Sequence, residues 1–440
     1  MKHLAIATLL ACASSRAPDV SARLQAVAQP PGLTVLRVLA DADGLGIRGA
    51  GAELAGRIYW TAGERGPNGT PACSSSAHWN DLEHTHHCPG ALVSIALDGS
   101  AFRVDYAFSR LDDVTSQNMD GYHPYGSPVA DTTGCLVGVA QAGGTPLGDP
   151  GEVAPGFGTL WRYCPASSTF TVLHMFFALA RALDGEYPMG SPAVLPDGRI
   201  CGTSKGGGAL SMGTVWCWSP GGAFAFAPLT DATGADSYGG ALYSGGLLHF
   251  TTSDGAANGA GAYVVADPAT ATLALTVVQA FDAFVYNDHG SDNTSIQAPT
   301  QLSNGAIVMA RQYAGAFGTG VVVGLSPRTG ITPMQAFDDI PLAATPRFAN
   351  LTGGMPNGRV TEAPSGLIVG TTEYGGAYGA GSIYELARDG TRFRLLYSFD
   401  PAGPSYPYGG LITASNGAVY GATFDAGAMF SFVAPIEACP

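Results

Sequence analysis

Apolar and polar positions follow one another along this chain in a repeated order. In residues 406–433, a small-residue segment precedes a short apolar stretch, a Ser-Asn-Gly turn, a second apolar stretch that ends in Gly-Ala-Thr, and a third apolar stretch after a glycine-containing turn. The same order returns in residues 355–386, and it is clear again in residues 187–218 and 295–323. Short apolar stretches separated by turn residues are typical of antiparallel strands, so the pattern predicts a β-repeat protein.

The glycine of the first turn counts the repeats. It recurs at seven positions: Gly56, Gly134, Gly198, Gly246, Gly305, Gly366 and Gly417. The spacing averages about 60 residues, which is enough for four short strands and their turns. In most repeats a fourth apolar stretch with a shared aromatic ending follows the third, as in residues 102–108, 170–176, 275–281 and 393–399.

The seventh repeat lacks this fourth strand. It stops at Val433, whereas residues 33–40 (LTVLRVLA), ahead of the first repeat, match the missing strand. A ring of sheets must join its first and last members, and pairing the N-terminal strand into the last sheet removes the open edge. We therefore predict an all-β fold: a seven-bladed β-propeller with four-stranded antiparallel blades, formed by residues 33–440 and closed by the N-terminal strand. A linear solenoid is the alternative, but it would need polar caps at both ends.

The cysteine positions support one common strand register. When the second and third repeats are aligned, Cys201 falls on Val137 and Cys217 falls on Arg162. In an antiparallel ladder, the residue numbers of two facing residues always add up to the same total. The pair Val137 and Arg162 has the same total as the pair Cys135 and Cys164, so the cysteine pair of the second repeat lies on the same ladder. The alternative is four unpaired buried thiols. We predict two disulfides, Cys135–Cys164 and Cys201–Cys217.

The first 17 residues indicate a targeting segment. Lys2 and His3 precede the apolar run LAIATLLA, and the sequence that ends at Cys12 resembles a bacterial lipoprotein processing box. Lipidation of Cys12 and simple secretion, with cleavage before Pro18, are the two alternatives. Residues 18–32 are predicted to form a flexible tether. Either alternative places the protein outside the cytoplasm, secreted or as a surface or periplasmic lipoprotein, with a lipid anchor as its one link to a membrane.

Composition and charge narrow the partners. Of the 440 residues, 46% are hydrophobic and 12% are charged, and the net charge is -14 at pH 7. This charge argues against a nucleic-acid binder, because phosphate contacts need a surplus of Lys and Arg. The chain contains no apolar run of 18 residues, so no spanning helix is expected. We expect a monomer.

Several short motifs of the best repeats resemble a known family. These are Tyr408-Gly409-Gly410, Asn416-Gly417, Gly370-Thr371-Thr372, Gly375-Gly376 and Gly381-Ser382-Ile383-Tyr384. The set is similar to the GloVer tandem repeat, found in predicted surface proteins with varied anchors. The resemblance implies a secreted, propeller-like repeat protein. It supplies no established activity, so no catalytic residue is carried over from it.

Departures from the repeat identify a candidate site. In a propeller, the loops between strands four and one and those between strands two and three share one face, and ligands commonly bind there near the axis. Arg48 and Gln297 replace a repeated glycine on this face, Arg311 replaces a threonine, and His123 stands where other repeats have tyrosine. We predict a ring of these side chains around the channel mouth, with two polar neighbours, Lys205 and Gln312. On a chain of charge -14, such a ring would focus an anionic ligand. The alternative is repeat drift with solvated side chains.

Two polar segments are candidate metal sites. The insertion at residues 70–90 is rich in imidazole and carboxylate groups, which can bind zinc or another divalent metal. Its predicted ligands are Asp81, His84, His86 and His87, and its bracketing cysteines, Cys73 and Cys88, are predicted to form a disulfide that closes the loop. The acidic linker at residues 281–296 has oxygen ligands suited to Ca²⁺, namely Asp282, Asp288 and Asp292 beside His289. A polar loop without metal is the alternative in both cases. Cys439 has no assigned partner.

Three functions are compatible with these patterns. The first is a surface propeller that binds a glycan, preferably an anionic polysaccharide, whose sugars stack on Tyr125, Tyr238 and Tyr408. The second is a polysaccharide lyase, with Arg48 or Arg311 neutralising a uronate carboxylate and His123 or a tyrosine removing the neighbouring proton. A glycoside hydrolase is less favoured because it needs two carboxylates, and Asp236 is the one obvious candidate. The third is a structural repeat without ligand. The sequence favours the binding protein.

Overall fold

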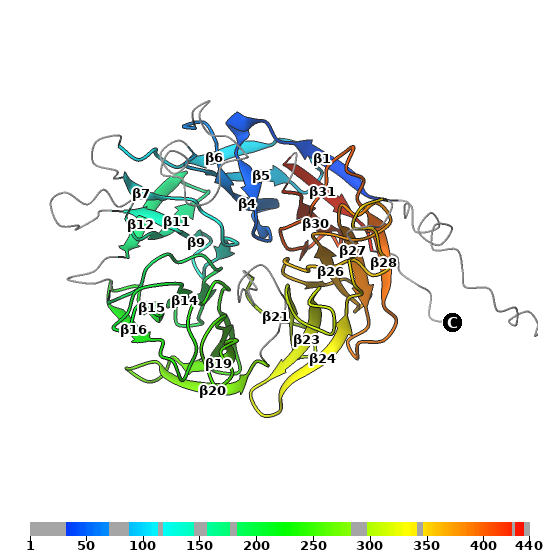
Figure 1. Cartoon of the computed structure of the whole chain (residues 1–440). Helices are drawn as coiled ribbons and strands as arrows, with labels where there is room; N and C mark the ends of the chain where they lie inside the picture. The colour runs from blue at the N-terminus through cyan, green and yellow to red at the C-terminus, as the bar shows by residue number, and fades with distance from the viewer. Residues whose placement is uncertain are drawn as a thin grey trace, which may run out of the picture.

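The fold is a ring of seven antiparallel sheets around a central axis (Figure 1). A computed structural model of the chain describes residues 32–69, 88–112, 118–144, 156–176, 183–282, 297–340, 346–424 and 427–434. Each sheet forms one blade, and its first strand lies at the centre, because these strands contact their counterparts in neighbouring blades, as β13 contacts β8 and β17. The predicted seven-bladed β-propeller is therefore confirmed.

The first four blades follow one another along the chain. Blade 1 comprises β2 (Leu45–Ile47), β3 (Ala52–Leu54), β4 (Arg57–Glu64), β5 (Ala91–Ala96) and β6 (Arg103–Ala107). Blade 2 comprises β8 (Val129–Ala130), β9 (Leu136–Ala140), β11 (Thr159–Cys164) and β12 (Thr169–Met175). Blade 3 comprises β13 (Ala193–Val194), β14 (Ile200–Ser204), β15 (Thr214–Trp218) and β16 (Phe224–Pro228). Blade 4 comprises β17 (Leu242–Ser244), β18 (Leu247–Thr251), β19 (Ala262–Asp267) and β20 (Ala274–Ala280).

The remaining blades follow the same plan. Blade 5 comprises β21 (Thr300–Gln301), β22 (Ile307–Arg311), β23 (Val321–Ser326) and β24 (Gly330–Ala336). Blade 6 comprises β25 (Thr361–Glu362), β26 (Ile368–Thr372), β27 (Ser382–Leu386) and β28 (Arg394–Ser398). Blade 7 comprises β29 (Ile412–Thr413), β30 (Val419–Ala422), β31 (Ala428–Phe432) and, from the start of the chain, β1 (Thr34–Val38).

Strand β1 closes the ring as predicted. It pairs antiparallel with β31, with Thr34 opposite Ser431 and Val38 opposite Ala428. Figure 1 shows the two strands side by side, although they come from opposite ends of the chain. The pairing supplies the fourth strand that the seventh repeat lacks, so blade 7 has no missing member.

Blades 1 and 2 carry features that the repeat did not predict. The innermost strand of blade 1 consists of two pieces, because both β2 and β3 pair with β4. Next to blade 2, β7 (Asn118–Tyr122) pairs with β10 (Ala142–Gly144) in a small separate sheet. A short 3-10 helix, η1 (Asp41–Asp43), follows β1. The described residues include no helix long and apolar enough to cross a bilayer.

Aromatic side chains at the ends of the fourth strands hold adjacent blades together. The ring centroid of Phe108 lies 6.1 Å from that of Trp161 in the next blade, and Phe176 lies 5.2 Å from Trp216 in the same relation. All four side chains are buried. The shared aromatic ending noted in the sequence is therefore the contact that joins one repeat to the next, and its large buried area is a main source of stability.

The strand register places the predicted cysteines opposite one another. In blade 2, Val137 faces Arg162, and in blade 3, Cys201 faces Cys217. Both predicted disulfides are confirmed: Cys135–Cys164 and Cys201–Cys217. Cys88 is also disulfide-bonded. The predicted pairing with Cys73 lies outside the described residues.

Candidate functional site

The segments that lead into strand one meet at the axis with their backbones in contact. A Cβ added at Gly190 would lie 2.3 Å from the carbonyl carbon of Gly239, and one added at Gly358 would lie 2.6 Å from the carbonyl oxygen of Gly409. No larger residue fits such a close approach without movement of the neighbouring blade. These glycines therefore narrow the channel at one level of the ring.

Gln297 occupies the equivalent position in blade 5 and spans the axis. Its Nε2 donates a hydrogen bond to the carbonyl oxygen of Arg48, at 2.8 Å, and its Oε1 accepts one from the hydroxyl of Ser127, at 3.3 Å. The side chain is 2% exposed. It links blade 5 to blades 1 and 2 across the axis. We call the face with the strand 4–1 and 2–3 loops the loop face, and the opposite one the turn face.

Arg48 lies on the loop face among aromatic rings from two neighbouring blades. Its Cζ lies 4.5 Å from the ring centroid of Tyr125, 5.3 Å from that of Tyr408 and 5.2 Å from that of Phe424. Its Nη2 lies 3.8 Å from a carboxylate oxygen of Glu64. Arg48 is 7% exposed. The structure thus brings together three of the predicted site residues, and it adds Phe424 and Glu64.

His123 joins this group through Tyr125. The Tyr125 hydroxyl lies 3.0 Å from His123 Nδ1. Burial raises the pKa of Tyr125 well above its usual value, so the hydroxyl stays protonated at neutral pH. We refer to Arg48, His123 and Tyr125 as the Arg48 cluster. It combines a cation, an imidazole and a protonated phenol near the axis.

His123 has a strained backbone conformation that recurs at the equivalent position of another blade. His123 has a left-handed φ of 54°, and the equivalent Tyr187 has 55°. The His123 N–H donates to the carbonyl of Pro89 in the preceding blade, and its own carbonyl accepts from Gln141. Non-glycine residues in this conformation are uncommon and persist where the surroundings hold them. The backbone conformation at this position therefore belongs to the fold, and His123 differs from the equivalent Tyr187 in its side chain.

Lys205 forms a second cation–aromatic pair. It follows β14 in blade 3, and its Nζ lies 4.7 Å from the ring centroid of Tyr238, which leads into strand one of blade 4. Both side chains are half-buried. Glu186 lies next to this pair, because its backbone exchanges two hydrogen bonds with Gly206. Burial raises the pKa of Glu186 above its usual value, a property that the sequence pattern did not signal.

Arg311 forms a third pair, in blade 5. Its Cζ lies 3.7 Å from the ring centroid of Phe281. Burial lowers the pKa of Arg311 to about 10, and the nearby carboxylate of Asp282 acts in the opposite direction. Gln312, the next residue, donates to Glu373, which also accepts a hydrogen bond from Asn357. Arg311 therefore packs, in blade 5, against a ring that the repeat had marked as a core position.

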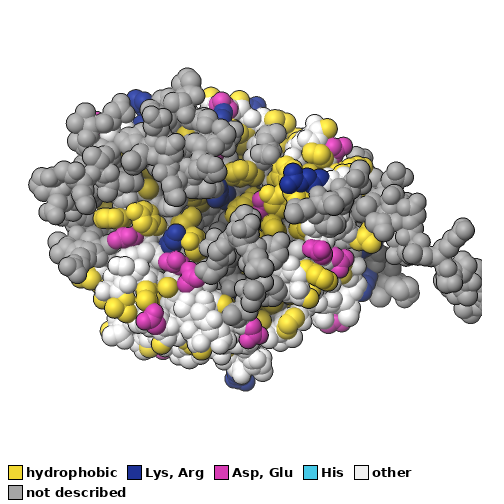
Figure 2. All heavy atoms as spheres, in the orientation of Figure 1, with side chains coloured by type: hydrophobic (Ala, Val, Ile, Leu, Met, Phe, Trp, Pro, Cys, Tyr) yellow, Lys and Arg dark blue, Asp and Glu magenta, His cyan; other side chains and the backbone are white. Residues whose placement is uncertain are grey.

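The loop face thus presents three cations, each against an aromatic ring of a neighbouring segment. They are Arg48 with Tyr125, Lys205 with Tyr238, and Arg311 with Phe281. Figure 2 shows Lys, Arg, Asp and Glu side chains around the middle of the ring, interspersed with hydrophobic ones. Comparison of the repeats identified Arg48 and Arg311 because they replace small residues, and it named Lys205 as their polar neighbour. It missed Phe281 because this residue matches the shared aromatic ending of strand four. It did not consider Glu64, at the end of β4, or Phe424, shortly after β30.

The predicted metal ligands lie outside the described residues. This applies to Asp81, His84, His86 and His87, to Asp288, His289 and Asp292 of the acidic linker, and to the lipidation candidate Cys12. Within the described ranges, no group of three or more His, Cys, Asp or Glu side chains is arranged to hold a metal. Zinc or calcium binding by these segments stays a prediction.

Comparison with known proteins finds similarity in fold. No protein-family model and no curated protein matches the chain, so the resemblance to the GloVer family stays a prediction. A catalytically inactive virginiamycin B lyase from Staphylococcus aureus, solved with quinupristin, is 13% identical, with a TM-score of 0.53 over 91% of this chain and 99% of that one. Oligogalacturonate lyase from Vibrio parahaemolyticus is 9% identical, with a TM-score of 0.50 over 92% and 93%.

A third solved structure covers a larger protein. The extracellular domain of a protein described as a one-component system from B. thetaiotaomicron is 7% identical, with a TM-score of 0.52 over 91% of this chain and 40% of that one. This chain therefore spans less than half of that domain. At such identities the three similarities establish the propeller fold alone.

Proposed function

We propose that this propeller binds an anionic glycan, a uronic-acid polymer, on its loop face and acts outside the cytoplasm. One observation carries the proposal: three cations lie against three aromatic rings around one axis, contributed by different blades. The two confirmed disulfides fit an oxidising compartment.

The Lys205–Tyr238 pair matches the two chemical features of a uronate, because both side chains are half-buried, whereas the rings of Tyr125 and Phe281 are 3% and 2% exposed and cannot stack on a sugar. The flat apolar face of a sugar ring stacks on an aromatic side chain, and its carboxylate forms charge-assisted hydrogen bonds with Lys or Arg. A neutral glycan would gain nothing from the charge of these cations. On a protein of net charge -14, a local group of cations also attracts an anion before contact.

Burial distinguishes the roles of the three cations. Lys205 and Arg311 are half-buried, so they are placed to contact the ligand. Arg48 is 7% exposed and shares its charge with Glu64 at 3.8 Å, so it contributes mainly to the potential at the axis. Substitution of Lys205 should therefore weaken binding with little effect on folding.

Affinity electrophoresis through gels that contain polygalacturonate tests the proposal. The expected result is retardation of the wild-type protein, and a loss of affinity of about tenfold, or about 1.4 kcal/mol, for both Lys205→Gln and Arg311→Gln. Arg328→Gln is the matched control, because Arg328 is exposed in the turn between β23 and β24, on the opposite face. Equal mobility in gels with and without the polymer would reject the proposal.

A uronate lyase is the second candidate, and the Arg48 cluster is the observation that favours it. In a β-elimination, His123 would accept the C5 proton of a uronate, a double bond would form between C4 and C5, and the C4–O bond would break. The Tyr125 hydroxyl, protonated at neutral pH, would donate its proton to the departing oxygen. Arg48 would stabilise the charge that develops on the carboxylate. The oligogalacturonate lyase with the same fold is named for action on a uronate chain.

The product of such an elimination absorbs ultraviolet light, and the substrate does not. A rise in absorbance on incubation with oligogalacturonate, abolished by His123→Ala and retained by Lys205→Gln at saturating substrate, would support the lyase. Retention in the gel without any rise would leave binding as the function.

A further inference from the structure

The turn face holds a cavity of about 390 Å³ at the axis, and no residue of the Arg48 cluster lines it. Its walls come from strand one and the strand 1–2 turn of successive blades, and they include Pro192, Leu195, Tyr243 and Pro299. This volume lies within the range of about 300–1,000 Å³ that is usual for small-molecule sites. We call it the axial cavity.

Arg359 is the one long cationic side chain among the residues that line the axial cavity. It follows Gly358 in the segment that leads into strand one of blade 6. The equivalent position in the other six repeats carries a small residue: Gly49, Ser127, Ser191, Gly240, Ala298 and Gly410. Comparison of the repeats at the preceding position, which is glycine in most blades, did not identify Arg359.

The guanidinium of Arg359 is held in place by a single neutral partner. Its Nε donates to the hydroxyl oxygen of Thr300, at 3.2 Å, and that hydroxyl donates in turn to the carbonyl of Val360, at 2.7 Å. Within the part of the chain that the structure describes, no carboxylate lies within ion-pair distance of Arg359. Arg359 is half-buried, and this burial lowers its pKa below the usual value.

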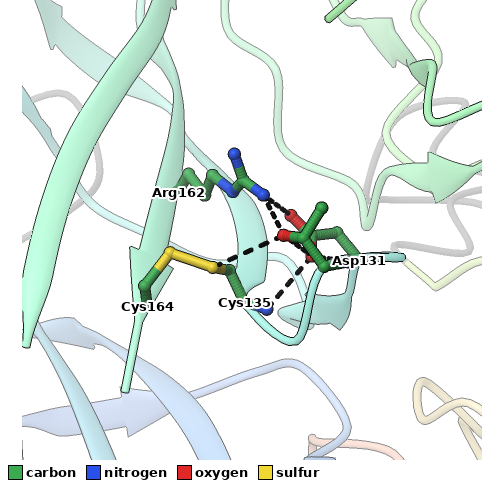
Figure 3. Close-up of polar contacts among 5 residues, drawn as sticks. Asp131, Cys135, Arg162 and Cys164 are labelled. Carbon is green, nitrogen blue, oxygen red and sulfur yellow. Dashed lines mark hydrogen bonds and ion pairs between the residues drawn. A yellow bond between two sulfur atoms is a disulfide. The ribbon is translucent and has the colours of Figure 1, made fainter. Parts of the chain in front are cut away.

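The other charged residue of the cavity wall is already neutralised. Asp131 accepts from Nη2 of Arg162, at 2.7 Å, and from the backbone N–H of Cys135, at 3.0 Å. Figure 3 shows this pair beside the Cys135–Cys164 disulfide, which anchors the same turn. Burial alone would raise the pKa of Asp131, but hydrogen bonds from Thr133 and Cys135 and the charge of Arg162 lower it below its usual value. Arg359 is left as the uncompensated charge of the cavity.

We propose that the axial cavity binds a small organic carboxylate, with the carboxylate on the Nη atoms of Arg359 and an apolar body against the proline, leucine and tyrosine walls. A partly desolvated cation without a counter-charge gains from the binding of an anion, and the planar guanidinium matches a carboxylate with two parallel hydrogen bonds. Perturbed titratable groups in a cavity are typical of functional sites. The site is distinct from that on the loop face, because Arg48, Lys205 and Arg311 are not among the residues that line the axial cavity.

Calorimetric titration with benzoate, a carboxylate with an apolar ring, tests this site. The expected result is saturable binding to the wild-type protein, at least about tenfold weaker binding of the neutral isostere benzamide, and a similar loss of benzoate affinity in Arg359→Gln. Arg388→Gln is the matched control. Arg388 belongs to the same blade but pairs with Glu362, outside the cavity, so its variant should bind benzoate as the wild type does.

The comparison of benzoate with benzamide uses the wild-type protein and keeps the test decisive even if Arg359→Gln fails to fold. Absence of benzoate binding, equal affinity for benzamide, or unchanged affinity in a folded Arg359→Gln protein would each overturn the proposal. None of these outcomes bears on polygalacturonate retention, which depends on Lys205 and Arg311.

Discussion

Individual polar side chains in this propeller are buried where they bridge strands or blades. His249 in β18 is an example outside both proposed sites. Its Nδ1 lies 2.6 Å from the hydroxyl of Tyr263, and its Nε2 lies 3.1 Å from the carbonyl oxygen of Ser244. It is 2% exposed, and burial lowers its pKa, although the Ser244 carbonyl acts in the opposite direction.

This environment predicts a pH dependence of stability. Because the folded-state pKa of His249 lies below the unfolded value of about 6.5, the unfolded chain binds more protons as the pH falls through that value. The free energy of unfolding should therefore decrease from pH 8 to pH 5.5, and His249→Gln should show a smaller decrease. Urea denaturation of both proteins at the two pH values measures this difference. An identical decrease in the variant would contradict the assignment.

At the scale of strands, the two disulfides each join strands two and three of one blade. Cys201–Cys217 closes a loop with a sequence separation of 16, and Cys135–Cys164 closes one with a separation of 29. In the chain-entropy description, a cross-link stabilises by restricting the unfolded chain, and its effect grows slowly with loop length.

The loss of stability on removal of each disulfide should therefore be larger for the longer loop. The double variant Cys201→Ala/Cys217→Ala is expected to lose about 3 kcal/mol of unfolding free energy, and Cys135→Ala/Cys164→Ala about 0.5 kcal/mol more. Urea denaturation without reductant measures both losses. Addition of reductant to the wild type, which removes these two cross-links and the disulfide of Cys88, should lower its stability by more than either variant does. A loss below about 1 kcal/mol in both variants would show that these cross-links do not stabilise the protein by restricting its unfolded chain.

The sequence predicted the strand order and the cysteine register because both are properties of a repeated local pattern. It did not predict the division of strand one in blade 1, the β7–β10 sheet or the register shifts in the outer strand pairs, such as that between Leu160 and Trp161. These features depend on how one insertion or one strand fits its neighbours. For the same reason, comparison of repeats identified Arg48 and Arg311 as unusual but did not predict which neighbours their side chains would contact. It also left Arg359 unnoticed.

At the scale of the whole molecule, the ring depends on β1. This strand pairs with β31, and the following Leu39 is buried and donates its N–H to the carbonyl of Gly427. Without it, the edge of β31 would present unpaired backbone groups, which promote association between chains.

Deletion of residues 33–40 should therefore destabilise the molecule. Loss of the buried Leu39 and the half-buried Leu36 is expected to cost about 3 kcal/mol or more, and light scattering should detect association through the exposed edge. A deletion of residues 18–31, which leaves β1 in place, is the control and should preserve the thermal midpoint. A monomer of unchanged midpoint after deletion of residues 33–40 would be inconsistent with closure by β1.

The closed ring presents two chemically different faces, and the central claim is that the loop face recognises negative charge on a sugar. The most direct measurement is the dissociation constant for an oligogalacturonate compared with that for its fully methyl-esterified form, which has the same length and stereochemistry but no charge. We predict that the ester binds at least about tenfold more weakly, and that Lys205→Gln removes most of this difference. Equal dissociation constants for the acid and the ester would contradict the claim.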